Sequence, residues 1–128
     1  MEIFFEIGFS EDEVLDIKQY INNLSKEEIL FKVYILKRIG CLDRHIKNII
    51  LTNPAYLIRS NDDILKLIKK LEDLKFKSLY ILLDSNPFIL NRDVYEIEEY
   101  INNKLNNGYV LEDIVDYLDN NPYIFDEM

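Results

Sequence analysis

The chain has 128 residues, 48% of them hydrophobic and 30% charged, and a net charge of −9 at pH 7. This size and composition fit one soluble globular domain with a buried core. They exclude a membrane-spanning chain, because no apolar run approaches the roughly 20 residues that cross a bilayer. One cysteine and one histidine also exclude an internal disulfide and a zinc site built from soft ligands.

The start of the chain and the lone Cys41 bear on the cellular compartment. Residues 1–6 lack the basic segment of a signal peptide and the arginines of a transit peptide. A single free thiol is typical of a reducing compartment. We therefore expect a cytoplasmic protein without a membrane partner.

Charge is segregated along the chain. Residues 1–31 carry eight acids and two bases, a net charge of −6. Residues 32–77 carry eleven bases and five acids, a net charge of +6, whereas residues 78–128 carry eleven acids and two bases, a net charge of −9. The chain therefore offers a basic middle flanked by acidic ends.

Serine capping boxes predict the first two long helices. One box at residues 10–13 opens a helix of about 14 residues, and another at residues 25–28 opens a second, for which Gly40 is the expected C-cap. Apolar residues cover much of the second helix, so we expect it to be central. Residues 4–7 are compatible with a brief strand, although a lone strand has nothing to pair with.

Helical spacing of apolar residues continues through the rest of the chain. A short helix is expected over 42–51, followed by a long helix from Ser60. The residues that face inward on that long helix are expected to be Ile64, Leu65, Leu67, Ile68, Leu71 and Leu74. A short helix over 78–83, a long helix capped by Asn91 or Asp93 and stopped at 106–108, and a short helix over 111–118 follow. No stretch keeps a strand period for long, which predicts an all-α fold.

A short phrase closes each pair of helices. All three prolines follow an asparagine within apolar sequence, at intervals of 33 and 35 residues: Asn53-Pro54, Asn86-Pro87 and Asn121-Pro122. Proline disfavours helical backbone in the residue before it and can open a new helical turn itself. Asparagine tolerates such a boundary because its side chain bonds to local backbone. Each phrase is therefore predicted to be a structural corner whose following apolar residues enter the core.

The nearly fixed interval predicts a helical-repeat architecture. One unit is a long helix, a turn, a short helix and a corner. Four units of about residues 8–24, 25–58, 59–91 and 92–128 would form a single solenoid domain over 1–128, with an atypical first unit that lacks the corner. The turn at Lys75 lacks the glycine of the other turns, so we expect a different geometry there.

This alternation of long helices, glycine turns and leucine-rich helices that end in Asn-Pro resembles the mitochondrial transcription termination factor (mTERF) family. The resemblance covers about residues 7–128. It implies an all-helical superhelix of repeats, often with nucleic acid bound along a basic concave groove, and no active site. The chain departs from the family pattern in being short and acidic.

The reactive side chains give no sign of catalysis. His45 is compatible with a base beside Asp43, but a surface histidine on a short helix is the commoner case. Cys41 follows a glycine turn and fits a buried structural thiol. Carboxylate pairs at 62–63, 98–99 and 112–113 lie at or near predicted helix starts, where they complement the helix dipole. No phosphate loop or nucleophile elbow is present, so we predict no enzyme, cofactor or metal site.

Binding is therefore the predicted function, and two classes of partner remain open. A protein partner fits the charge-segregated surface, because the net charge repels a polyphosphate. DNA or RNA is the alternative, bound through the middle segment 32–77. The candidate binding surface comprises Lys37, Arg38, Arg44, Lys47, Lys66, Lys69, Lys70, Lys75 and Lys77.

Further surface roles follow from the same charges. Self-association would join the basic middle of one copy to the acidic end of another. Alternatively, the acidic last unit imitates nucleic acid in the basic cleft of another protein. Tyr95 and Tyr100 flank acidic residues on one predicted helix, and they are either solvated tyrosines or partner contacts.

Overall fold

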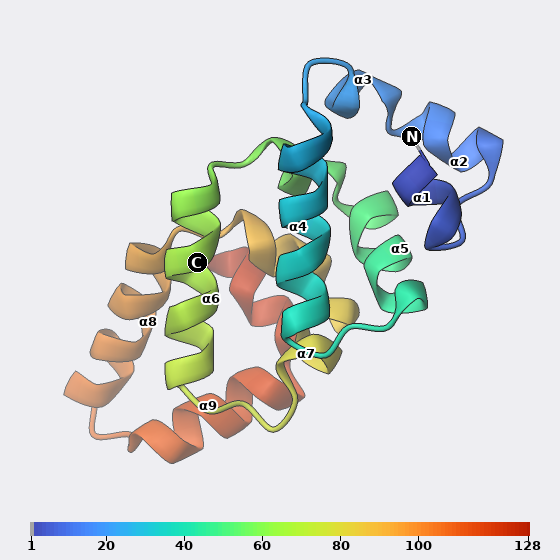
Figure 1. Cartoon of the computed structure of the whole chain (residues 1–128). Coiled ribbons are helices and arrows are strands. Elements are labelled where there is room, and N and C mark those ends of the chain that lie inside the picture. The colour runs from blue at the N-terminus through green and yellow to red at the C-terminus, as the bar shows by residue number, and fades with distance from the viewer. Residues whose placement is uncertain (1) are drawn as a thin grey trace.

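The computed structural model describes residues 2–128, and within them every regular element is a helix (Figure 1). The α-helices are α1 (Glu2–Glu6), α2 (Glu11–Asp16), α3 (Lys18–Ile21), α4 (Lys26–Arg38), α5 (Asp43–Thr52), α6 (Asn61–Asp73), α7 (Leu79–Ser85), α8 (Val94–Asn106) and α9 (Leu111–Asn120). The 3-10 helices are η1 (Pro54–Ile58), η2 (Pro87–Asn91) and η3 (Pro122–Glu127). The predicted all-α class is confirmed.

Side-chain caps begin the three long helices α4, α6 and α8. The hydroxyl oxygens of Ser25 and Ser60 each accept a hydrogen bond from the backbone N–H three residues later. Asp93 forms a capping box with Glu96, whose carboxylate accepts from the Asp93 N–H at 2.9 Å. These caps satisfy donors that the first helical turn leaves without partners. Asp93 rather than Asn91 is therefore the cap of α8.

Left-handed backbone ends the helices that precede the glycine turns. This conformation, which glycine adopts without strain, occurs at Gly8, Gly40 and Gly108. At the end of α4, the Cys41 N–H donates to the Leu36 carbonyl at 3.0 Å, and the Gly40 N–H donates to the carbonyl three residues back. These paired bonds form a Schellman C-cap. The predicted role of Gly40 is confirmed.

The turn after α6 has left-handed backbone too, although it lacks glycine. Lys75 has a φ of +61°, a conformation that costs a residue with a Cβ about 1–2 kcal/mol. The geometry still differs from that of the glycine turns, as expected, because their φ values are +93° to +106°. The Phe76 N–H also lacks the bond to the carbonyl five residues back that Cys41 and Tyr109 make. The buried Leu74 and the half-buried Phe76 flank the turn, and their packing outweighs the strain at Lys75.

The corners have the predicted backbone. Helices α5, α7 and α9 end at the three asparagines, and each following proline is the first residue of a 3-10 helix. Each 3-10 helix sends at least two buried apolar side chains into the core: Tyr56 and Leu57, Ile89 and Leu90 (with Pro87), and Ile124 and Phe125. The corners therefore turn the chain and fill the core at once.

Elements of the same kind pack side by side. Helix α5 packs against α7, α6 against α8, and the 3-10 helices contact one another in succession.

Helix α4 lies between α5 and α6 (Figure 1) and buries five of its thirteen residues, so it is the expected central helix. Helices α1–α3 lie at one end of the molecule, and α8 and α9 lie at the other (Figure 1).

Two local predictions are wrong, and the brief strand considered at residues 4–7 is absent. Phe4 belongs to helix α1, and its ring centroid lies 5.1 Å from that of Phe9. The predicted 14-residue helix is broken into α2 and α3 at Ile17, which leaves helical geometry (φ −104°, ψ 3°) while its side chain is buried in the core. Leu65 is exposed, because it lies about 100° around the helix from Ile64 and off the buried stripe.

Candidate functional site

The first corner is joined to the second by a buried asparagine. The Nδ2 of Asn53 donates to the Pro87 carbonyl and to Oδ1 of Asn91, both at 3.0 Å. Asn53 is only 2% exposed. Because a buried amide donor without a partner is costly, these bonds fix how the two corners pack.

The second corner repeats this arrangement, and the third does not. The Nδ2 of Asn86 donates to the Pro122 carbonyl and to Oδ1 of Asp126, both at 3.0 Å. No further corner follows Asn121 within residues 2–128, and its Nδ2 donates back to the Tyr117 carbonyl in α9 at 2.9 Å. The amide of the last asparagine therefore bonds within its own helix, whereas the amides of the first two bond to a separate corner.

Lys32, which adds to the charge of the basic middle, is buried inside the fold. Its Nζ donates to the carbonyls of Leu57 at 3.1 Å and Arg59 at 2.6 Å. The Tyr56 hydroxyl donates to the Lys32 carbonyl at 2.6 Å. Burial lowers the pKa of Lys32 and raises the pKa of Tyr56. Lys32 therefore ties α4 to the first corner and does not face a partner.

Four of the nine predicted surface bases lie in ion pairs. Their N–O distances are 3.3 Å for Arg38–Glu72, 2.9 Å for Lys47–Glu13, 3.8 Å for Lys69–Asp73 and 3.9 Å for Lys70–Glu98. A backbone hydrogen bond from Ser10 and then the contact with Lys47 lower the pKa of Glu13. These carboxylates neutralise part of the positive charge that a phosphate backbone would need.

The remaining five bases are Lys37, Arg44, Lys66, Lys75 and Lys77, and they do not line one groove. Lys37 and Arg44 share a shallow pocket with Cys41 and Asp43. The backbone N–H of Lys77 donates to a carboxylate oxygen of Asp119 at 3.1 Å, in the loop between α6 and α7. Only the first two of these five therefore form a local basic cluster.

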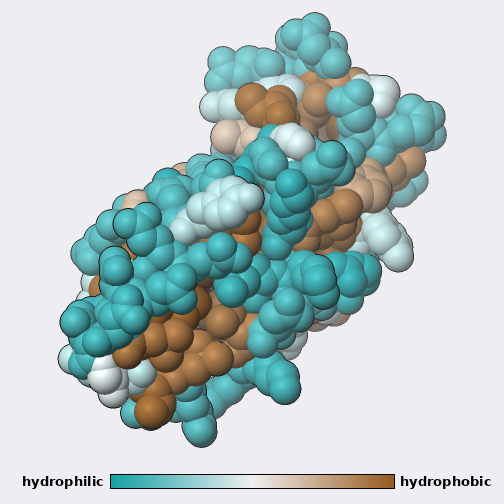
Figure 2. All heavy atoms as spheres, turned by 90° about the vertical axis from the view of Figure 1, so that its left-hand side faces the viewer, coloured by the Kyte–Doolittle hydropathy of each residue, from teal (hydrophilic) through white to brown (hydrophobic). Residues whose placement is uncertain are grey.

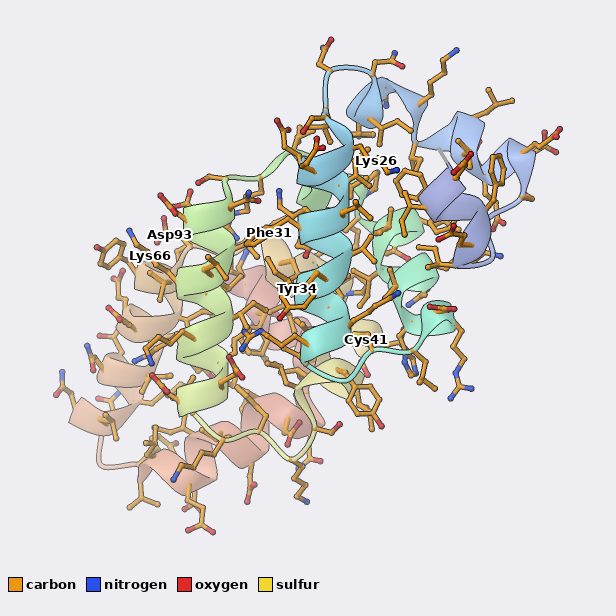
Figure 3. The ribbon with its side chains drawn as sticks, in the orientation of Figure 1. Lys26, Phe31, Tyr34, Cys41, Lys66 and Asp93 are labelled. Atoms are coloured by element: carbon orange, nitrogen blue, oxygen red, sulfur yellow. The ribbon has the colours of Figure 1, made fainter. Side chains whose placement is uncertain are left out.

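Lys66 and Lys75 lie in two other pockets that also contain acids. Lys66 lines a small pocket with Asp93, and Figure 3 shows these two side chains together at the edge of α6, away from Cys41. Lys75 lines a pocket with Glu112 and Asp116, between α6 and α9. The predicted basic surface is therefore divided and interspersed with carboxylates.

His45 and Cys41 are both buried. His45 accepts at Nδ1 from the Leu42 N–H at 2.9 Å, and its ring centroid lies 5.2 Å from that of Tyr80. The prediction of a surface histidine is wrong, because this ring caps the start of α5. The buried Cys41 thiol is confirmed, and burial followed by the charge of Asp84 raises its pKa to about 12.

A pocket opens between α8 and α9 at the C-terminal end of the molecule. It has a volume of about 400 Å³ and is lined by Tyr100, Lys104, Tyr109, Asp113, Ile114 and Tyr117. The Lys104 Nζ lies 5.5 Å from the ring centroid of Tyr100 and 5.7 Å from that of Tyr109. At such distances the face of an aromatic ring attracts a cation. The pocket therefore already holds a cation of its own chain.

Three exposed apolar side chains lie on the same two helices and the turn between them: Leu105, Val110 and Leu111. Leu111 also lines the pocket between α6 and α9. Figure 2 shows a hydrophobic patch low on the side of the molecule where α8 and α9 lie. Burial, with contributions from the neighbouring Tyr117 and Glu127, raises the pKa of Tyr100. The C-terminal face denotes the pocket lining together with these three apolar residues.

Sequence reasoning found only part of this face. It singled out Tyr95 and Tyr100, of which Tyr100 lines the pocket and Tyr95 is 72% exposed elsewhere on α8. It missed Lys104, Tyr109 and Tyr117. Of these three, only Lys104 had a signal in the sequence, its four-residue spacing from Tyr100, which places both side chains on one helix face.

No three histidine, cysteine, aspartate or glutamate side chains of residues 2–128 gather closely enough to hold a metal ion. No helix in the described part of the chain combines the length and apolar character that crossing a bilayer requires. The chain matches no family model, no curated protein and no solved structure. A functional assignment therefore rests on the residues of this chain.

Proposed function

We propose that the chain is a non-enzymatic helical-repeat module that binds a protein partner. The order of long helix, short helix and 3-10 helix occurs three times, and the asparagine bonds that join successive corners support a repeat. With α2 and α3 as an atypical first unit, about four stacked units form one solenoid domain. This arrangement agrees with the superhelix that the mTERF resemblance implies.

The uncovered C-terminal face carries the proposal. The second and third corners each cover the corner before them, whereas Asn121 bonds only within α9. The tyrosine pocket and the exposed apolar residues lie on this last unit. Contiguous exposed apolar groups with a polar rim are typical of protein-binding surfaces, in which tyrosine is enriched.

The acidic charge of residues 78–128 indicates which kind of partner protein would bind. Residues 78–128 have eleven acids and two bases, so their surface attracts a basic partner and repels phosphates. Self-association is disfavoured at range because both copies carry a net charge of −9. In the basic middle, Arg38, Lys47 and Lys70 are already paired with carboxylates of the same chain. A basic surface of another protein is the favoured partner.

The test compares two variants as immobilised baits in a nuclease-treated extract of the native host. The double variant Tyr109→Ala/Tyr117→Ala alters the C-terminal face at two exposed side chains. The control Lys66→Ala/Lys69→Ala alters two exposed positions of α6. We expect a protein that the wild type and the control capture and the double variant does not. Equal capture by all three, or no captured protein, contradicts the proposal.

Nucleic acid is the second candidate, favoured by the cluster of Lys37 and Arg44. Both are exposed, line one pocket, and have no carboxylate within ion-pair distance among residues 2–128. Labelled single- and double-stranded oligonucleotides at low salt test this candidate against Lys37→Glu/Arg44→Glu and against the triple variant Lys66/Lys69/Lys70→Glu. Non-specific binding is expected at roughly 1–100 μM and should weaken steeply with salt. No binding in this range removes the candidate.

A further inference from the structure

We propose that the pocket between α8 and α9 is a receptor for a cationic side chain, lysine or arginine, of the protein partner. In the free protein Lys104 occupies the tyrosine faces, and the cation of the partner displaces it. This inference rests on the proposed function, and it adds the residue type that the face recognises and a built-in competitor.

The lining of the pocket suits a cation with an aliphatic stem. Tyr100 and Tyr109 present ring faces, which attract cations by their quadrupoles, and Tyr117 adds a third ring to the lining. Ile114 supplies apolar contact for the methylene groups that lysine and arginine bury along apolar surface. Asp113 supplies a carboxylate on the same lining. The combination of three rings, one apolar side chain and one acid distinguishes this pocket from the three other pockets described above and from a fourth lined by Tyr20 and Ile58.

Lys104 uses only part of this lining. Its Nζ lies over the rings of Tyr100 and Tyr109. Within residues 2–128, no lysine or arginine nitrogen lies within 4.0 Å of the Asp113 carboxylate. The exposed Asp113 carboxylate is therefore open to a cation from outside, which would add an ion pair that Lys104 does not make.

The charge around the pocket favours the exchange. The other base of residues 78–128, Arg92, is held by the Glu96 carboxylate at 3.4 Å and by the Met128 carbonyl at 3.3 Å. Lys104 is held by the rings alone in the described structure and can swing into water. The eleven acids of this segment raise the local concentration of a cationic partner group.

The first experiment measures binding of three small probes by NMR of the ¹⁵N-labelled protein. The probes are the Nα-acetyl methylamides of lysine, arginine and norleucine, the last of which has the apolar stem without the charge. We expect the two cationic probes to shift the backbone resonances of Tyr109, Asp113 and Tyr117. Norleucine should leave them in place at the same concentration. Equal shifts from norleucine, or no shift from any probe, overturn the inference.

Variants separate the pocket from the general negative field. Lys104→Ala removes the competitor and should tighten binding of the lysine probe by about two- to fivefold. Lys69→Ala makes the same change of net charge at a side chain on α6 that is 80% exposed and should leave affinity unchanged. If both variants tighten binding equally, the effect is net charge alone and the inference is wrong.

Two tyrosine variants complete the test. Tyr117→Ala should weaken binding of the lysine probe, whereas Tyr95→Ala, which removes an exposed ring elsewhere on α8, should not. The outcomes distinguish this inference from the proposed function. If no cationic probe binds but Tyr109→Ala/Tyr117→Ala still abolishes protein capture, the inference fails and the proposed function stands. If the probes bind but capture ignores these tyrosines, the proposed function fails.

Discussion

The first two Asn-Pro corners and the last one share a sequence phrase but use it differently. Asn53 and Asn86 each donate two hydrogen bonds to the following corner, across 34 to 40 residues of chain. Asn121 donates to a carbonyl four residues back in its own helix. The Asn-Pro motif therefore bends the chain at all three corners. It forms side-chain hydrogen bonds to another corner only where that corner packs against it.

The same difference appears in the turns that precede the short helices. Cys41, directly after Gly40, is buried, whereas Tyr109, directly after Gly108, is 57% exposed. The inner position is covered by neighbouring elements, while the last one lies on an open surface. The proposed binding surface lies at this more exposed turn, among the side chains of α8 and α9.

The largest expected effect on stability comes from removing the Asn53 side chain, whose hydrogen bonds join the first two corners. Asn53→Ala leaves the Pro87 carbonyl and the Asn91 side chain without a buried donor, which should lower the free energy of unfolding by about 3 kcal/mol. Asn121→Ala removes one exposed local bond and should cost about 0.5 kcal/mol. Urea denaturation of the two variants measures both values. Similar losses in the two variants would contradict the distinction between inner and last corners.

The second-largest expected effect on stability concerns the Tyr56 hydroxyl, which joins the first corner to α4. Tyr56→Phe removes the 2.6 Å bond to the buried Lys32 carbonyl and should lower the free energy of unfolding by about 1.5 kcal/mol. Tyr123→Phe makes the same change at an exposed residue of the last corner and should be close to neutral. Thermal denaturation is a sufficient readout. A cost at Tyr123 equal to that at Tyr56 would argue against the comparison.

A smaller effect of the opposite sign is expected at Lys75. Lys75→Gly relieves the left-handed backbone of this turn and should raise the free energy of unfolding by about 1 kcal/mol, because glycine adopts this region without strain. Gly108→Ala introduces the same strain at the last turn and should lower it by a similar amount. Urea midpoints of the two variants give the signs. Destabilisation by Lys75→Gly would show that the lysine side chain contributes more than its backbone costs.

The smallest expected effect on stability at neutral pH concerns Cys41. Its thiol also shows whether reagents can reach the turn after α4. Its thiol pKa rises from 9.0 to about 12 in the fold, so the folded state keeps a proton that the unfolded state loses. Its contribution to stability is therefore complete below about pH 9 and is lost as the pH rises from 9 to about 12. Native protein should resist iodoacetamide at pH 8 and react readily in urea. Rapid alkylation of the native protein would show that this turn is open.

Local patterns in the sequence were sufficient for most of the fold. Capping serines, glycine turns and Asn-Pro phrases act over a few residues, so the helix boundaries near Ser25, Ser60 and Gly40 agree with the structure. The break at Ile17 and the left-handed Lys75 were missed, because tertiary packing decided them against local preference. The second ends of the asparagine bonds lie a whole unit away and have no local signal.

The candidate site was predicted less well, for a related reason. Side-chain charge was counted along the chain, but Lys32 is buried and Lys47 is paired with a carboxylate more than 30 residues away. Fewer bases of the middle segment are therefore free to contact a partner in the fold than a count along the sequence suggested. The tyrosine pocket combines residues of two helices, and only Tyr100 with Lys104 had a spacing that pointed to it.

Hydrogen exchange of the asparagine side-chain amides tests the central claim most directly. The Nδ2 protons of Asn53, Asn86 and Asn121 give separate signals in a ¹⁵N-labelled protein, and their decay in D₂O reports how well each is held. The bridges predict slow exchange at Asn53 and Asn86 and fast exchange at Asn121. Equal rates at all three, or slowest exchange at Asn121, would contradict the account of inner corners that bridge and a last corner that leaves its face open.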